Sequence, residues 1–158
     1  MKQKSALVCL AVLAAALGGF YIYAHNRNIT TTANVATGCR AKTVKVGATG
    51  NCVRDIQTMT DYMQTAELIE CPFRSGRLLP ITGTYDSATA AQVKVIQAWA
   101  NCYYQQEGMN QNITISGIVD NDTWVELCNY AYNSPKESNS TVSPYTQASL
   151  AAGKNANC

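Results

Sequence analysis

Two stretches of this sequence repeat one order of residue types, and they constrain the fold more than any other feature. Residues 82–93 read TGTYDSATAAQV, and residues 116–124 read SGIVDNDTW. Each holds a Gly, a large apolar residue two positions later, then an Asp, and a Thr three residues after the Asp. A Gly permits a tight turn at positive φ, and an Asp accepts hydrogen bonds from the free N–H groups that begin a helix. The sequence therefore predicts a turn, an N-cap and a helix, twice over.

Apolar residues at helical spacing predict three short helices. The first follows VGATGN at residues 46–51, the second begins after Asp86, and the third opens at Asp120 or Asn121. Their buried faces are expected to hold Val53, Ile56, Met59, Thr60 and Met63; then Thr89, Val93, Ile96, Ala100 and Tyr103; then Trp124, Leu127, Cys128 and Ala131. Helices this short are marginal alone, so they must pack on each other. The predicted fold class is all-α, a small three-helix domain with Tyr85 and Val119 in its core.

The N-terminal residues predict export. Lys2 and Lys4 precede an uncharged, largely apolar run over residues 5–24. Such a run is typical of a cleaved signal peptide, and it is also about long enough to remain as a membrane anchor. Both alternatives stay open, with an extracellular location in either case. The predicted organisation is a signal or anchor over 1–24, a linker over 25–43, a domain over 44–131 and a flexible C-terminal tail over 132–158.

The charge balance argues against a nucleic-acid partner. The formal net charge of +2 falls to −1 without residues 1–28, which leaves 9 basic and 10 acidic side chains. Binding to a phosphate backbone needs clustered Lys and Arg, and no such cluster remains. We expect membrane contact only through the N-terminal segment.

The cysteines predict disulfides. Cys9 lies inside the apolar run, and six others lie outside it, at positions 39, 52, 71, 102, 128 and 158. An even set in an exported chain is typical of a disulfide framework, here with about 15 possible pairings. No CxxC pair occurs and His25 is the only His, so zinc spacing is absent. We expect no metal and no cofactor.

The residue types also argue against an enzyme. One His in a linker cannot supply a Ser-His-Asp triad, a zinc hydrolase site or the base for a Cys nucleophile. Two carboxylate pairs remain. Glu67 and Glu70 are interpreted as solvated residues, and Asp120 and Asp122 as a helix cap with its first turn. The predicted role is non-catalytic.

The block from Val44 to Cys128 resembles the small peptidoglycan-binding domain of bacterial cell-wall hydrolases and secreted wall proteins. That family's pattern runs G-x-x-G-x-x-V-x-x-L-Q, then D-G-x-F-G-x-x-T-x-x-A-V-x-x-F-Q, then D-G-x-V-G-x-x-T-W-x-x-L. The matching residues here are Gly47, Gly50, Val53, Ile56 and Gln57; Gly83, Tyr85, Thr89, Val93, Ile96 and Gln97; and Gly117, Val119, Thr123, Trp124 and Leu127. The departures are Thr82 and Ser116 before the turn glycines, and Asp86 and Asp120 where the family has Gly. The resemblance implies a bacterial, three-helix module that holds peptidoglycan, through either its glycan strand or its stem peptide.

The candidate ligand-binding residues follow from the matched turns and from the aromatic side chains, which stack on sugars or pack on peptides. They are Thr82, Gly83, Tyr85, Asp86, Gln97, Tyr103, Tyr104, Gly117, Asp120, Trp124 and Tyr130. Helical spacing favours a core position for Tyr103 and Trp124. Tyr104 and Tyr130 are harder to place inside. Gln57 and Gln97 either bond a ligand or lie at a helix edge.

The resemblance also implies how the cysteines pair. Cys52, at the start of the first helix, is expected to join Cys128 at the end of the third. Cys71 is then expected to join Cys102, and Cys39 to join Cys158. An alternative function stays open: a protein–protein interaction module on the same fold that no longer binds wall polymer, because Asp86 and Asp120 would repel a ligand carboxylate.

Overall fold

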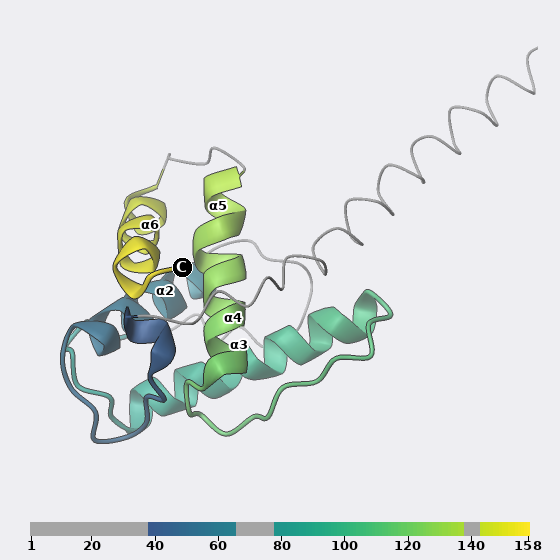
Figure 1. Ribbon diagram of the computed structural model, residues 1–158, viewed down its shortest axis with the longest axis horizontal. Coiled ribbons are helices and arrows are strands. Elements are labelled where there is room, and N and C mark those ends of the chain that lie inside the picture. Colours follow the sequence, from purple (N-terminus) through teal and green to yellow (C-terminus); the bar gives the residue numbers. More distant parts are fainter. Residues whose placement is uncertain (1–37, 66–77, 138–142) are drawn as a thin grey trace, which may run out of the picture. The chain divides into compact units, whose positions relative to one another are not determined.

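The structure is a computed structural model that describes residues 38–65, 78–137 and 143–158 (Figure 1). Its elements are η1 (Gly38–Ala41), α2 (Asn51–Thr65), α3 (Ser87–Gln106), α4 (Asn121–Cys128), η2 (Asn129–Asn133), α5 (Ser134–Glu137) and α6 (Pro144–Ala156). Over these ranges the chain forms no β-strand, only two isolated bridges, Val44 with Val119 and Thr49 with Thr84. The all-α prediction is confirmed.

The three predicted helices are α2, α3 and α4, and they bury the faces that the sequence indicated. Ile56, Val93 and Trp124, one from each helix, are no more than 1% exposed. Tyr85 and Val119 are fully buried beside the starts of α3 and α4, as predicted. Of the residues expected on the buried faces, Tyr103 alone is only half-buried.

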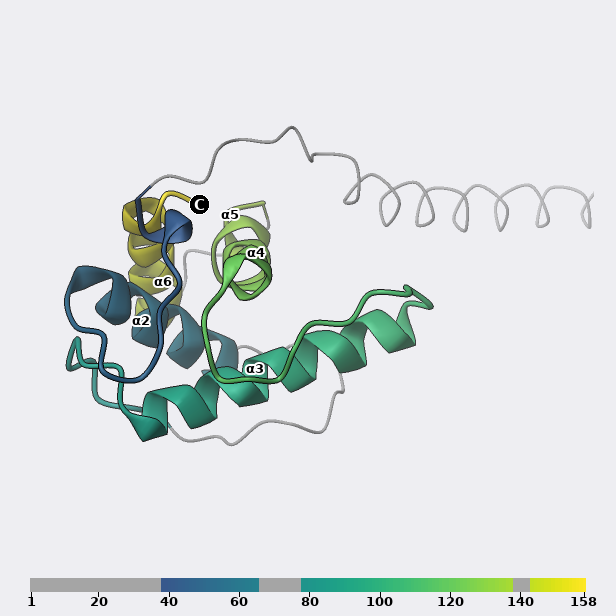
Figure 2. The ribbon, with the colours of Figure 1, turned by 60° about the horizontal axis from the view of Figure 1, so that its bottom comes forward.

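The segment that begins at α4 is longer than predicted. α4 continues directly into the π-helix η2 and then α5, and the three form one rod that crosses α3 (Figures 1 and 2). Trp124, in α4, anchors the rod: its ring is fully buried and its Nε1–H donates to the carbonyl of Lys42 at 2.9 Å. Tyr130 and Ala131 bury the next turn.

Residues 42–50, here called the strap, run past both glycine turns and join them. Val44 exchanges two backbone hydrogen bonds with Val119, each 2.9 Å. Farther along, Gly47 donates to the carbonyl of Tyr85, and Gly50 donates to that of Gly83, again at 2.9 Å. The strap therefore holds the starts of α3 and α4 in one frame.

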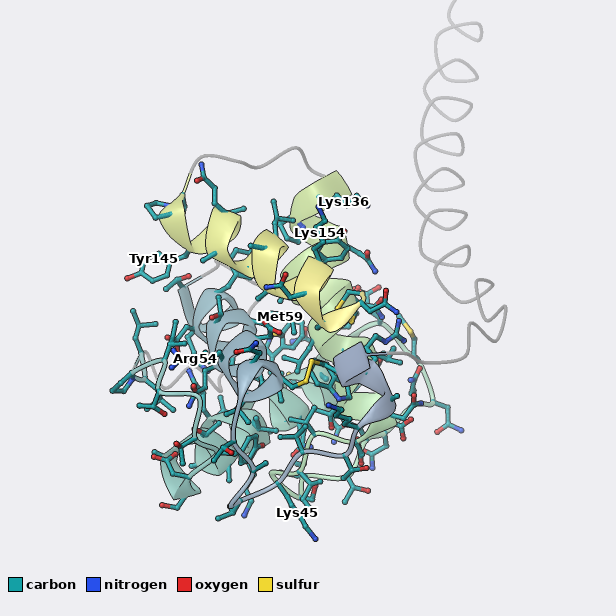
Figure 3. The ribbon with its side chains drawn as sticks, turned by 60° about the vertical axis from the view of Figure 1, so that its left-hand side comes forward. Lys45, Arg54, Met59, Lys136, Tyr145 and Lys154 are labelled. Carbon is teal, nitrogen blue, oxygen red and sulfur yellow. A yellow bond between two sulfur atoms is a disulfide. The ribbon has the colours of Figure 1, made fainter. Side chains whose placement is uncertain are left out.

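The end of the chain corrects the prediction of a flexible tail over 132–158. Residues 144–156 form α6, which packs mainly on α2 (Figure 3). Ser143 caps it with hydrogen bonds from the N–H groups of Tyr145 and Thr146, and Asn157 ends it in the left-handed conformation. Ala152 and Ala156 are buried. The compact unit therefore extends to Cys158.

The predicted cysteine pairing is also wrong. Cys39 bonds Cys52, with their Cα atoms 5.4 Å apart, and Cys128 bonds Cys158, with theirs 5.3 Å apart. Neither Cys52–Cys128 nor Cys39–Cys158 forms, because η1 returns to the start of α2 and α6 returns to the end of α4. Cys102 is disulfide-bonded too, but the predicted Cys71–Cys102 pair stays a prediction since Cys71 lies outside the described residues.

The first 37 residues also lie outside the described part. They include the predicted signal or anchor and most of the predicted linker. The last residues of that linker prove to be structured, because η1 is a 3-10 helix with a buried, disulfide-bonded Cys39. Among the described helices, none is both long and apolar enough to cross a membrane.

Candidate binding sites

Gln57 links α2 to the first repeated turn. Its Oε1 accepts from the N–H of Gly83 at 2.9 Å, and its Nε2 donates to the carbonyl of Thr84 and the hydroxyl of Thr89, both at 3.1 Å. The side chain is 1% exposed. Its amide is thus saturated by the turn that leads into α3, and it is not available to a ligand.

Gln97 repeats this arrangement one helix later. Its Oε1 accepts from the N–H of Gly117, and its Nε2 donates to the carbonyl of Ile118 and the hydroxyl of Thr123, each at 2.9 Å. It too is buried, at 0% exposure. The sequence left a ligand role and a helix-edge role open for both glutamines. In the structure each one clamps the next glycine turn.

The caps complete the repeated unit. The carboxylate of Asp86 accepts from the N–H and the hydroxyl of Thr89 at 2.8 and 2.9 Å, and that of Asp120 accepts from the same groups of Thr123 at 2.9 and 2.8 Å. These hydrogen bonds lower the pKa of Asp86. Gly83 and Gly117 have φ of 75° and 73°, as the turns require. The predicted turn and cap are confirmed in both copies.

Most of the predicted ligand residues therefore face the interior. Buried ones are Gly83, Tyr85, Gln97, Tyr104, Gly117, Trp124 and Tyr130; Tyr103 and Asp120 are partly buried; Thr82 and Asp86 are exposed. The hydroxyl of Tyr85 is occupied as well, since it donates to the carbonyl of Gly117 at 2.8 Å. This burial argues against direct contact between these residues and a polymer.

The aromatic residues form an internal cluster rather than an exposed platform. The ring of Trp99 contacts those of Tyr103 and Tyr130, with centroids 5.8 and 4.5 Å apart. Tyr103 also lies edge-on to Tyr104. Tyr104 and Tyr130, which the sequence did not readily place inside, are 6% and 8% exposed. The cluster joins α3 to the rod of α4 and η2.

Glu126 is an ionisable group that sequence reasoning missed. It is 1% exposed, and its Oε1 accepts a hydrogen bond from the hydroxyl of Tyr104, while its Oε2 has no partner among the described residues. Burial raises the pKa of Glu126 to about 7, and the hydrogen bond from Tyr104 lowers it by less. The signal in the sequence was helical spacing, because Glu126 lies three residues after Thr123 and four before Tyr130, both of which are buried, and α4 holds no basic residue. It is sealed in the core and faces no pocket that the structure describes.

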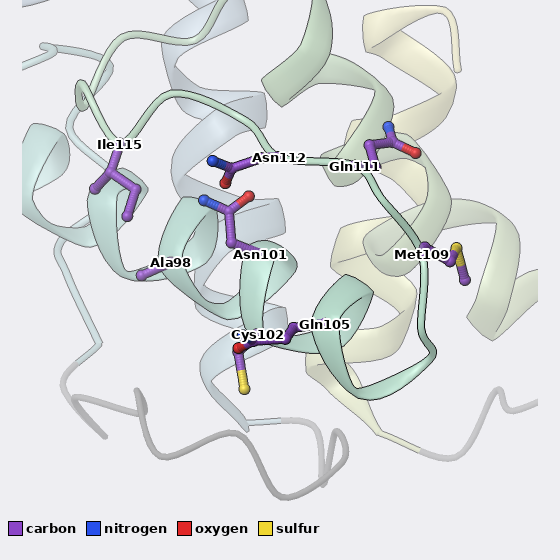
Figure 4. A pocket seen from close by; sticks show the side chains of 8 residues that line it. All are labelled: Ala98, Asn101, Cys102, Gln105, Met109, Gln111, Asn112 and Ile115. Carbon is purple, nitrogen blue, oxygen red and sulfur yellow. The ribbon is translucent and has the colours of Figure 1, made fainter.

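A pocket of about 420 Å³ lies between the second half of α3 and the chain that returns from it (Figure 4). Its lining is Ala98, Asn101, Cys102, Gln105, Met109, Gln111, Asn112 and Ile115. Figure 4 shows the α3 residues on one side and the 109–115 segment on the other. None of the lining residues carries a formal charge at neutral pH, since Cys102 is disulfide-bonded.

The outer wall of the pocket is fixed in place by two contacts with α3. The amide of Asn101 accepts from the N–H of Ile113 at 2.7 Å and donates to its carbonyl at 2.9 Å. Nearer the turn, the N–H of Met109 donates to the carbonyl of Tyr104 at 2.8 Å. Ile113 is 5% exposed and belongs to the core. The pocket is therefore formed before any ligand arrives.

Three side-chain amides at the pocket have no hydrogen-bond partner in the described part of the chain. Gln105, Gln111 and Asn112 are exposed and form no side-chain hydrogen bond that the described part of the chain provides. The sequence analysis chose none of these three as site residues. The signal was the density of Asn and Gln in this stretch, but only the pairing of Asn101 with Ile113 shows that the amides border a pocket.

The described residues contain no group of three or more His, Cys, Asp or Glu side chains placed to hold a metal ion. In comparisons with known proteins, no family model matches the chain, and neither a curated protein nor a solved structure does.

Proposed function

We propose that this protein is a non-catalytic module that binds bacterial cell-wall peptidoglycan. The observation that carries the proposal is the pair of glutamine clamps. In the family pattern, a Gln closes each of the first two elements and a Gly opens the next. Here Gln57 bonds Gly83 and Gln97 bonds Gly117, with the same geometry. The quoted residues thus act together in space, which favours a true resemblance over a chance match of short motifs.

Other features agree with this role. The unit is stapled by Cys39–Cys52 and Cys128–Cys158, as suits an oxidising compartment outside the cell. The preformed pocket beside α3 offers a surface for a neutral ligand. With a linker and an export signal predicted ahead of the compact unit, the module would tether or space a partner at the wall.

A pull-down on purified, insoluble wall sacculi tests the proposal. The full chain, kept in mild detergent in case the N-terminal segment is retained, is mixed with sacculi or with cellulose particles of equal mass. We expect retention on sacculi that survives moderate salt and is lost after reduction and unfolding. Equal retention on cellulose, or none on sacculi at low salt, would reject wall binding.

The second candidate is a protein–protein interaction module on this fold. It is favoured by the caps: Asp86 and Asp120 each accept from one N–H at the starts of α3 and α4, and their negative charges would repel a ligand carboxylate there. Failure of the sacculi experiment with a correctly folded chain, checked by disulfide mapping, would favour this candidate.

A further inference from the structure

We infer that the pocket beside α3 takes a neutral, N-acetylated amino sugar, so that the module holds the glycan strand rather than the stem peptide. The inference rests on the proposed wall-binding function and assigns its site and ligand class. It begins from the absence of charge: amides, methyl groups and a disulfide sulfur line the pocket.

The lining chemistry matches an acetamido sugar. Gln105, Gln111 and Asn112 present free amides that donate to an acetamido carbonyl and accept from ring hydroxyls. Ala98 and Ile115 supply apolar surface for the acetyl methyl group and the sugar face. A volume of about 420 Å³ is near the lower end for ligand pockets, which suits one or two sugar rings.

A charged stem peptide fits less well. Its carboxylates would have to give up water without meeting a cation among the lining residues, and an unpaired charge is costly to desolvate. The helix starts are no better suited, because the carboxylates of Asp86 and Asp120, which cap them, would repel a second carboxylate. Both observations favour the uncharged part of the polymer.

The pocket is also preorganised. The two hydrogen bonds between Asn101 and Ile113 fix its outer wall, so little chain entropy is lost when a ligand enters. Since Gln105, Gln111 and Asn112 bond nothing in the described protein, truncating them leaves the fold intact. Binding and folding are therefore separable by mutation.

Titration of the ¹⁵N-labelled full chain by NMR tests the inference, with N,N′-diacetylchitobiose as the probe and cellobiose as the matched sugar that lacks acetamido groups. We expect diacetylchitobiose alone to shift the side-chain amide signals of Gln105, Gln111 and Asn112. Shifts of equal size with cellobiose, or none with either sugar, would overturn the assignment.

Two matched pairs of variants locate the site. Asn112→Ala is expected to weaken binding about tenfold, while Asn110→Ala, in the same exposed loop but outside the lining, leaves it unchanged. Ala98→Met fills the pocket and is expected to abolish binding, whereas Ala91→Met, on an exposed position of α3, does not. Binding that is unaffected by both Asn112→Ala and Ala98→Met would contradict the pocket.

Competition on sacculi separates this inference from the proposed function. Release of the chain from sacculi by diacetylchitobiose supports both. If the sugar does not release the chain from sacculi and does not shift the signals of the pocket amides, wall binding stands and the glycan assignment is overturned. Pocket shifts without retention on sacculi support the sugar site and reject wall binding.

Discussion

The side chain of Gln57 holds the backbone of Gly83, 26 residues away in sequence, with the Gly83 N–H donating to Gln57 Oε1 at 2.9 Å. The bond fixes the turn at Gly83 through which the chain enters α3. The buried amide satisfies backbone groups that would otherwise be without partners, so it stabilises the fold more than an exposed amide does.

We predict that Gln57→Ala lowers the free energy of unfolding by about 2–4 kcal/mol, because it leaves a cavity and strands the buried N–H of Gly83. Gln105→Ala, on an exposed residue, is the control and is expected to change it by less than about 0.5 kcal/mol. Urea unfolding measures both. Equal midpoints for the two variants would contradict a structural role for the clamp.

Glu126 is expected to make stability depend on pH. Its pKa is raised from 4.5 to about 7, so between these values the folded state holds a proton that the unfolded state has released. Stability attributable to this group is therefore greatest at low pH and falls as pH rises through this window, by about 3 kcal/mol at most.

Glu126→Gln is expected to remove this dependence of stability on pH. The test is urea unfolding of both proteins at several pH values from about 5 to 8, with the difference between the two curves isolating Glu126 from other groups such as Asp55, whose pKa burial also raises. Glu107→Gln, on an exposed acidic residue outside α4 that does not contribute to the raised pKa of Glu126, serves as the control. Parallel pH profiles for the native chain and Glu126→Gln would exclude the proposed titration.

The Cys128–Cys158 and Cys39–Cys52 disulfides are expected to stabilise the fold to a similar extent. Cys128–Cys158 spans 30 residues and Cys39–Cys52 spans 13. Replacing both cysteines of either pair with Ser is therefore expected to lower the free energy of unfolding by about 3–4 kcal/mol. Loss of Cys128–Cys158 should also speed amide hydrogen exchange in α6. Non-reducing peptide mapping checks the pairing itself, and a Cys52–Cys128 peptide would refute this topology.

At Gly153, even the methyl side chain of Ala is predicted to clash with its neighbours. A Cβ at this position would lie 2.5 Å from the ring of Tyr132, so Gly153→Ala should destabilise by about 1–3 kcal/mol. Helix propensity alone predicts the opposite sign, a gain of about 1 kcal/mol. Thermal unfolding decides between them. The second change Tyr132→Gly should relieve the clash, because it removes both the ring and the Cβ of residue 132, which would lie 2.6 Å away. A stabilised Gly153→Ala single variant would show that α6 does not pack this closely.

The parts of the fold that the sequence predicted are those encoded locally. Gly83, Asp86 and Thr89 lie within seven residues, and their turn and cap need no distant partner to be recognised. α6 was missed although Ser143 and Pro144 form a standard helix start, because its sequence is rich in small and polar residues. Its helix depends on packing against α2 and on Cys158, and neither shows in a local pattern.

The candidate site was less predictable for the same reason. Whether Gln97 meets a ligand or a turn depends on where Gly117 lies, 20 residues away. The pairing of Cys128 depends on α6, so missing this helix also led to the wrong disulfide partner for Cys128. The pocket arises only when Asn101 fastens Ile113 to α3, and composition alone cannot give that contact.

The position of Cys39–Cys52 has a mechanical consequence. A pull on the chain ahead of Cys39 passes through the sulfur bridge directly into α2, so residues 40–51 carry no tension. The strap's bonds to Val119 and Tyr85 lie inside this bypassed loop and would not be peeled apart one by one. Under load from its N-terminal side, the unit should resist stretching until α2 itself is drawn from the core.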